Sequence, residues 1–463
     1  MKKRMTEGKI FPQLLLFALP LVIGSILQLS YNLFDFIILG WFSTTPITDQ
    51  AAVGIANPIM SIFISLISGL CLGIAIHSSN LFGKNDIPNL KRQFTSVLLV
   101  GLFFILLLTI LFIIFLEPIM TISNVTDVVL RKQVKQYLLI IAIGLISTFI
   151  YNLYASVLRS IGDSISSLLF LTVSCVLNIT LNIIFVVTLK KGVLGVALAT
   201  LISQLLSAIS ITIYSKLRYK DIFLFRIKEY VIDTSLLKIS IPYAISSALQ
   251  QVVLYVGKYI ISTQINKYGE IIIDAFASAT KIDDFVFTPA QNFAAATSIF
   301  FSQNYGANKI KRAKKGFMSG FLLNMIYGVL ISIIIFVIKK PVLNVFISSD
   351  ASLITSKAEI LNNACIYLNI MCCLYMLPSI TNAMQSFFRG SGKVTIVFLS
   401  TLVQITARVI FVILLMHLTS KPMVSAAFGT GIGWIFMIAF ELPILIVHFK
   451  QLKEEDPVIT KEE

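Results

Sequence analysis

Long apolar segments dominate this chain and restrict the folds open to it. A helix needs about 20 mostly apolar residues to cross a bilayer, and the 463-residue sequence holds twelve such segments. Only 13% of the residues are charged, against about 25% in a soluble domain. We therefore predict an all-α integral membrane protein with twelve transmembrane helices. The predicted cores are 12–40, 51–80, 95–117, 133–158, 165–189, 193–215, 236–264, 272–303, 316–339, 357–388, 394–417 and 423–449.

The basic residues predict the orientation of these spans. Of the 37 Lys and Arg residues, 24 fall on the side that holds both termini, ten fall on the other side and three fall inside spans. Because cytoplasmic loops carry the excess of Lys and Arg, we predict that both termini are cytoplasmic (N-in/C-in). The net charge of +15 then reflects basic loops beside anionic lipid headgroups rather than a nucleic-acid partner.

The two halves of the sequence repeat each other. LFGKNDIPNLKR (81–92) recurs as NYGANKIKRAKK (304–315), and YNLYASVLRSIGD (151–163) recurs as TNAMQSFFRGSGK (381–393). Each half contains six spans, an even number, so both copies keep one orientation. Parallel repeats of this kind occur in secondary transporters and are related by an axis along the membrane normal. We predict two six-helix lobes related by a pseudo-two-fold internal repeat, with a central cavity between them.

The predicted domain boundaries follow from this repeat. The N-terminal lobe is expected at 1–215 and the C-terminal lobe at 236–450. A basic cytoplasmic linker, 216–235, connects them, and 451–463 is expected to form a cytoplasmic tail.

One carboxylate lies inside the first span, in the stretch YNLFDFIILG. This residue, Asp35, shares a helical face with Gln28, Tyr31 and Asn32. A charge inside a membrane span is costly and usually functional. A desolvated carboxylate can carry a proton, and oxygen ligands suit hard cations such as Na⁺. We therefore expect Asp35 to have a functional role.

Polar side chains also mark the other spans of the first half. Asn152 lies in the fourth span, Asn178 and Asn182 are one helical turn apart in the fifth, and Thr200 lies in the sixth. Their oxygen atoms could complete an ion site around Asp35. The alternative is ordinary interhelical hydrogen bonding, worth about 1 kcal/mol for each bond. The sequence leaves both interpretations open for these amides and for Thr200.

The second half carries different charges. The repeat aligns Asp35 of the first half with Gly257 of the second half. The second half instead carries charged residues that include Asp283, Asp284 and Arg408. One interpretation is a structural ion pair in which Arg408 or Lys281 pairs with one of the two aspartates. The other is a carboxylate that faces the cavity and attracts a cationic substrate. Glu441 lies near a predicted helix end and is expected at the membrane interface.

Pro20 lies inside the first span and is the preferred hinge candidate. Proline removes a helical hydrogen bond and permits a bend. Because Pro20 lies a few turns from Asp35, a bend there could change the surroundings of the carboxylate.

These features together resemble the MATE (multidrug and toxic compound extrusion) family. The resemblance is carried by Pro20, Gln28 and Asp35 in the first span, by QNYGANKIKRAKKG (303–316), by the LRSIGD and FRGSGK elements, and by GVLGVALAT (192–200). It implies a two-lobed bundle in which Asp35 couples ion binding to transport. It further implies that Asn178, Asn182, Thr200 and Asn152 belong to the ion site. The remaining candidates are assigned to the substrate cavity: Gln28, Tyr31, Asn32, Asp283, Asp284 and Arg408.

The expected function is export of organic, cationic drugs or toxic metabolites by alternating access, driven by H⁺ or Na⁺. We expect no cofactor, no catalytic residue and no metal beyond Na⁺ at Asp35. The expected partners are small organic substrates and the lipid bilayer, and the protein is expected to be a monomer in a bacterial cell membrane.

Two other functions remain as alternatives. A flippase for lipid-linked precursors of the same broad superfamily would use Lys258, Lys281 and Arg408 to bind a pyrophosphate. A membrane-embedded enzyme would need a nucleophile–base or metal constellation, and the three histidines of this chain are scattered.

Overall fold

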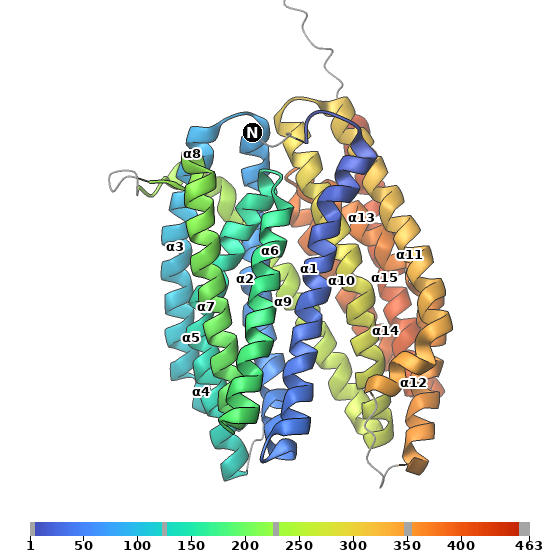
Figure 1. Cartoon of the computed structure of the whole chain (residues 1–463). Coiled ribbons are helices and arrows are strands. Elements are labelled where there is room, and N and C mark those ends of the chain that lie inside the picture. Colours follow the sequence, from blue (N-terminus) through green and yellow to red (C-terminus); the bar gives the residue numbers. More distant parts are fainter. Residues whose placement is uncertain (1–4, 123–126, 226–230, 347–353, 453–463) are drawn as a thin grey trace, which may run out of the picture. The chain divides into compact units, whose positions relative to one another are not determined.

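The computed structural model describes residues 5–122, 127–225, 231–346 and 354–452, and in these ranges the regular structure is helical (Figure 1). The helices of the first half are α1 (Ile10–Phe42), α2 (Pro46–Gly83), α3 (Ile87–Ile114), α4 (Leu116–Ile122), α5 (Val128–Ser160), α6 (Ser164–Asn182), η1 (Ile183–Thr188), α7 (Gly192–Arg218) and α8 (Lys220–Phe223). Those of the second half are α9 (Thr234–Ile265), η3 (Asn266–Tyr268), α10 (Glu270–Gly306), α11 (Ile310–Phe346), α12 (Ile354–Leu374), α13 (Met376–Gly390), α14 (Val394–Thr419) and α15 (Pro422–Gln451). The predicted tail, 451–463, lies outside the described residues from position 453 onward.

Each of the twelve predicted spans coincides with a helix or with two consecutive helices. Within the described ranges, ten helices are long and apolar enough to cross a membrane, with α6 and η1 counted as one. The pair α12 and α13 passes the same test together, with a bend of 46° between its two parts. The bend falls at Tyr375, just before Pro378, a residue that cannot donate a helical hydrogen bond and so permits a bend. The remaining long helix, α10, has 37 residues and is more polar because it carries Lys281, Asp283 and Asp284.

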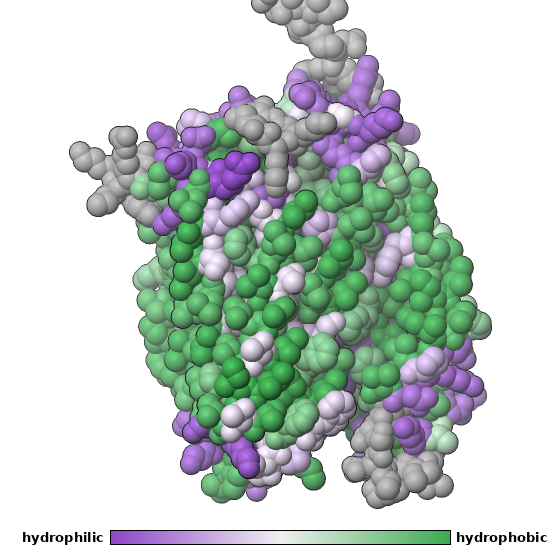
Figure 2. Space-filling model, in the orientation of Figure 1, coloured by the Kyte–Doolittle hydropathy of each residue, from purple (hydrophilic) through white to green (hydrophobic). Residues whose placement is uncertain are grey.

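Apolar side chains cover the middle of the helices, and hydrophilic residues gather at their ends (Figure 2). Large exposed hydrophobic residues recur along α3 and α11, for example Phe103 and Val337. A water-soluble protein rarely exposes such continuous apolar surface. The arrangement therefore suits helices whose outer surface contacts lipid.

The turns between helices show the internal repeat in the backbone. Three turns of the first half place a residue in the left-handed region, and the turns at the matching positions of the second half do the same. The pairs are Asn85 with Asn308, Gly162 with Gly392, and Lys190 with Ser420. Few residues other than glycine adopt this conformation. The two halves therefore share the same sequence of helices and the same turn geometry.

The described chain folds into two compact units. The N-terminal unit contains residues 19–82 and 86–252, and the C-terminal unit contains residues 5–18, 83–85 and 253–452. Helix α1 thus contributes to both units, and the change occurs between Ala18 and Leu19, next to Pro20.

Two glycines bring α2 and α9 close together inside the N-terminal unit. A Cβ atom on Gly73 would lie 2.2 Å from the carbonyl oxygen of Tyr243, and one on Gly69 would lie 2.6 Å from the Cα atom of Ala248. One turn further along α2, His77 Nδ1 lies 2.9 Å from the Ser240 hydroxyl. Small residues spaced four apart allow membrane helices to pack backbone against backbone.

We expect Gly73→Ala to destabilise the protein by about 1–3 kcal/mol, the usual cost of overpacking, because the clash is with backbone that cannot rotate away. Gly54→Ala in the same helix is the matched control, since nothing lies within 4 Å of a Cβ atom built there. The measurement is the apparent melting temperature of each purified variant in detergent. Equal melting temperatures for the two variants would contradict the close packing of α2 and α9.

Candidate functional site: a buried carboxylate and its amide neighbours

Asp35 is buried inside the N-terminal unit, with only 5% of its surface exposed. Helix α1 supplies no basic residue in its last turn, and Asp35 has no ion-pair partner among the described residues. A buried carboxylate without a counter-charge must be hydrogen-bonded, bind a cation or carry a proton.

A chain of hydrogen bonds connects this carboxylate to two further helices. Asn182 Nδ2, at the end of α6, donates to Asp35 Oδ1 at 2.5 Å and to Asn178 Oδ1 at 3.1 Å. Asn178 Nδ2 in turn donates to the Thr200 hydroxyl on α7 at 3.2 Å. The structure therefore brings together four of the residues expected at the ion site, from three helices.

Asn182 occupies a special place in the backbone. The α-helical hydrogen bonding of α6 ends at this residue, and the following six residues form the π-helical turn η1. Single π-helical turns are rare and occur frequently at functional sites. The carbonyl oxygen of the Asn182 side chain is buried and has no hydrogen-bond partner in the described part of the chain. It is an available oxygen ligand next to Asp35.

Asn152 does not join this chain of hydrogen bonds. Its Nδ2 donates to the backbone carbonyl of Thr148 in its own helix at 2.8 Å. The Thr148 hydroxyl instead donates to Gln204 Oε1 on α7 at 2.9 Å. Thr148 of α5 thus contacts α7 at Gln204 rather than at Thr200.

The residues on the Asp35 face of α1 lie in different surroundings. Gln28 is exposed and Tyr31 is partly buried. The Asp35 carboxylate acts electrostatically on Tyr31 and on Tyr137 of α5. The structure describes the backbone of Asn32 but not its side chain.

The C-terminal unit contains a second buried carboxylate, Asp283 of α10. It accepts hydrogen bonds from the hydroxyl groups of Tyr367 at 2.7 Å and Tyr375 at 2.8 Å. Both tyrosines are fully buried, on and next to α12. Neither tyrosine was a candidate in the sequence, because nothing in the local pattern indicates that residues 84 and 92 positions away meet Asp283.

The ion pair in this region differs from the one considered in the sequence. Asp284 pairs with Lys258 of α9, and both side chains are partly exposed. Arg408 makes no ion pair within the described ranges, and its buried Nε atom has no hydrogen-bond partner there. The Lys281 ammonium group lies 5.6 Å from the centre of the Phe346 ring.

The interfacial depth expected for Glu441 stays a prediction, and the structure adds that this residue is buried within the protein. Glu441 is fully buried in the C-terminal unit, beside Arg389 and Ser400. Helix α15 continues for ten residues beyond it, to Gln451, so that Glu441 is farther from the helix end than the sequence suggested. Arg389, at the end of α13, is 4% exposed and donates from Nη2 to Gln385 Oε1 at 3.0 Å.

The arrangement around Asp35 is suited to binding and releasing one small cation. Carboxylate, amide and hydroxyl oxygens are the preferred ligands of hard cations, and the same carboxylate can accept a proton instead. The described residues hold no group of three His, Cys, Asp or Glu side chains placed to share a metal ion.

Comparison with known proteins gives the family. The MatE family model matches residues 20–184 and again residues 246–414, once in each half of the repeat. The probable multidrug resistance protein YoeA of Bacillus subtilis is 23% identical over 96% of this chain and 94% of its own length. The probable multidrug resistance protein YpnP of the same organism is 28% identical over 66% of this chain and 68% of its own length.

Solved structures share the fold. The outward-facing structure of a multidrug resistance MATE family transporter of the MOP superfamily superimposes with a TM-score of 0.88, at 20% identity, over 97% of this chain and 98% of that one. The matching family model covers most of the sequence, and the helical architecture agrees with it. The chain therefore belongs to the MatE family of multidrug efflux transporters and is a multi-span membrane transporter rather than an enzyme.

Proposed function

We propose that the protein is a cation-coupled antiporter that exports organic, cationic compounds and takes up H⁺ or Na⁺ at Asp35. The observation that carries this proposal is the Asp35 carboxylate, which is buried, has no basic partner among the described residues and accepts a hydrogen bond from Asn182. Such a group is stable when it binds a cation or proton and costly when it is empty and charged. Asn178, Asn182 and Thr200 complete the proposed ion site. Asn152, whose side chain bonds within α5, is proposed as a member on the family resemblance alone.

Ion exchange at Asp35 drives transport only if it changes the balance between two conformations. A ligand shifts such an equilibrium by its differential affinity for the two states. Helix α1 is well placed for this coupling, because it contains Asp35 and passes from one unit to the other beside Pro20. We propose Pro20 as the hinge that lets the two parts of α1 move separately.

The proposed substrate-binding residues are named for each unit by itself. Gln28 and Tyr31 supply polar groups near Asp35, and Asp283 and Asp284 supply negative charge in the C-terminal unit. We propose lobes at 1–215 and 236–450, both termini in the cytoplasm, and a monomer in a bacterial cell membrane. The bacterial relatives YoeA and YpnP support this location.

The experiment is uptake of ethidium into proteoliposomes that contain the purified protein. A pH gradient and a Na⁺ gradient are applied separately, each with an ionophore control that collapses it. We expect one of the two gradients to drive accumulation and its ionophore to abolish it. Accumulation that is equal with and without both gradients would rule out a cation-coupled antiporter.

A further inference from the structure

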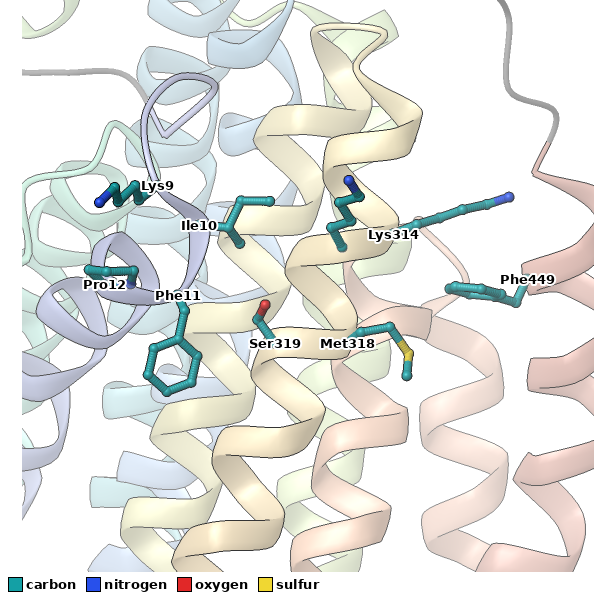
Figure 3. A pocket seen from close by; sticks show the side chains of 9 residues that line it. Lys9, Ile10, Phe11, Pro12, Lys314, Met318, Ser319 and Phe449 are labelled. Atoms are coloured by element: carbon teal, nitrogen blue, oxygen red, sulfur yellow. The ribbon is translucent and has the colours of Figure 1, made fainter.

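A shallow, open pocket of about 720 Å³ lies where the start of α1 meets the first turns of α11 (Figure 3). Its basic side chains are Lys9, Lys314 and Lys315. Its apolar side chains include Phe11 from α1, Met318 from α11 and Phe449 from the end of α15. All of them belong to the C-terminal unit, so the pocket is a feature of that unit alone.

The segment that carries Lys9 is fixed in place by Arg312. The guanidinium donates from Nη1 to the carbonyl oxygen of Gly8 at 2.7 Å, and from Nη2 to that of Glu7 at 2.9 Å and to Gln13 Oε1 at 2.9 Å. Its Nε also donates to the carbonyl oxygen of Met5 at 3.2 Å. Four contacts to one guanidinium hold the chain before α1 against α11, so that the wall bearing Lys9 and Phe11 is preformed.

The lining separates into a charged part and an apolar part. None of the nine lining residues is acidic, and three are lysines. The Lys314 ammonium lies 5.4 Å from the centre of the Phe449 ring, which places positive charge directly beside apolar surface. Below the lysines, α11 continues with the exposed side chains of Met318 and Leu322. The pocket thus joins positive charge to a helix surface that faces lipid.

We propose that this pocket binds the headgroup of an anionic phospholipid, with the phosphate at Lys9, Lys314 and Lys315 and an acyl chain along Met318 and Leu322. Basic pockets between membrane helices recognise anionic headgroups. A free phosphate ion would use only the charged part of the pocket and leave its apolar part in contact with water. A phospholipid uses both parts, since its negative charge and its hydrocarbon are covalently joined.

The test is a lipid titration of the purified full-length protein in detergent, with bound lipids counted by native mass spectrometry. The probes are dioleoyl-phosphatidylglycerol, which is anionic, and dioleoyl-phosphatidylcholine, which is zwitterionic. We expect preferential binding of phosphatidylglycerol to wild type. Each lysine near a headgroup contributes about fivefold in affinity, so the triple variant Lys9→Gln, Lys314→Gln, Lys315→Gln should bind roughly a hundredfold more weakly.

Two further variants make the result specific. The variant Lys267→Gln, Lys339→Gln, Lys340→Gln removes three lysines at other places in the same unit, and it should bind like wild type. The variant Met318→Asp keeps all three pocket lysines but puts a carboxylate in the apolar part, and it should also lose binding. Melting temperatures of all variants show whether they remain folded.

Three results would overturn the proposal. One is equal binding of phosphatidylglycerol and phosphatidylcholine to wild type. Another is equal loss of binding in the pocket variant and in the Lys267, Lys339 and Lys340 control, which would indicate a general charge effect. The third is full competition by inorganic phosphate at concentrations similar to the lipid, which would identify an anion site rather than a lipid site.

Discussion

Asp35→Asn is expected to abolish gradient-driven transport while leaving the protein folded and able to bind its substrate. The change replaces one carboxylate oxygen by an amide nitrogen of almost the same size, so the packing of α1 is retained. It removes the negative charge that a bound H⁺ or Na⁺ would neutralise, so an occupied ion site and an empty one no longer differ in charge at this side chain. A differential ion affinity of 1.4 kcal/mol corresponds to a factor of ten, so we expect gradient-driven uptake to fall at least about tenfold.

Two measurements separate coupling from binding. Ethidium uptake under the active gradient reports coupled transport, and ethidium binding without a gradient reports the substrate site alone. Asp274→Asn is the matched control, because it removes an exposed carboxylate of α10. We expect Asp35→Asn to lose uptake and keep binding, and Asp274→Asn to keep both. If Asp35→Asn transports as well as wild type, the coupling site must lie elsewhere, with Asp283 as the next candidate.

Arg389→Leu is expected to destabilise the C-terminal unit by about 1–3 kcal/mol, because it removes a positive charge near the buried Glu441 carboxylate, whose oxygens have no hydrogen-bond partner among the described residues. Glu441 is fully buried and Arg389 nearly so, and the two charges act on each other. Replacement of both residues by leucine removes the unpaired charge. The double variant Arg389→Leu, Glu441→Leu should therefore be considerably more stable than Arg389→Leu alone.

The internal repeat supplies a matched control for the Arg389→Leu variant. Arg159 occupies the position of Arg389 in the first half, and it donates to the Ser156 hydroxyl at 2.7 Å. The residue that corresponds to Glu441 there is Ile211. Arg159→Leu thus leaves no buried carboxylate behind and should cost less than Arg389→Leu. Circular dichroism during unfolding in detergent gives the stabilities of wild type, Arg389→Leu, Glu441→Leu and the double variant, with Arg159→Leu measured beside them. Strictly additive effects of the two single leucine substitutions would show that Arg389 and Glu441 are not coupled.

The helices and the internal repeat could be predicted from the sequence, because both are local patterns. Runs of about 20 apolar residues identify spans without knowledge of their neighbours, and the repeated motifs mark the same turns twice. The bend between α12 and α13 could not be placed, although Pro378 lies beside it. Proline indicates that a helix can bend but does not fix the direction or size of the bend.

The candidate site was predictable only in part. Helical spacing places Asn178 and Asn182 on one face of α6, but it does not say that this face meets α1. The resemblance to the MATE family supplied that expectation. No sequence pattern indicated Tyr367 and Tyr375 as partners of Asp283, or Arg389 as the neighbour of Glu441, because these contacts depend on how distant helices pack.

The paired turns have a consequence for the history of the chain. Asn85 and Asn308 adopt the left-handed conformation that asparagine tolerates, and Lys190 and Ser420 adopt it at a cost of about 1–2 kcal/mol. Its recurrence at matching positions, with one match of the family model in each half, indicates a duplicated six-helix unit. Since the duplication, the backbone has been kept while the buried acids have diverged. Asp35 has Gly257 as its counterpart, and Glu441 has Ile211. Each half thus carries a buried carboxylate that the matching position of the other half lacks, so the two halves share their turns and differ in their buried charge.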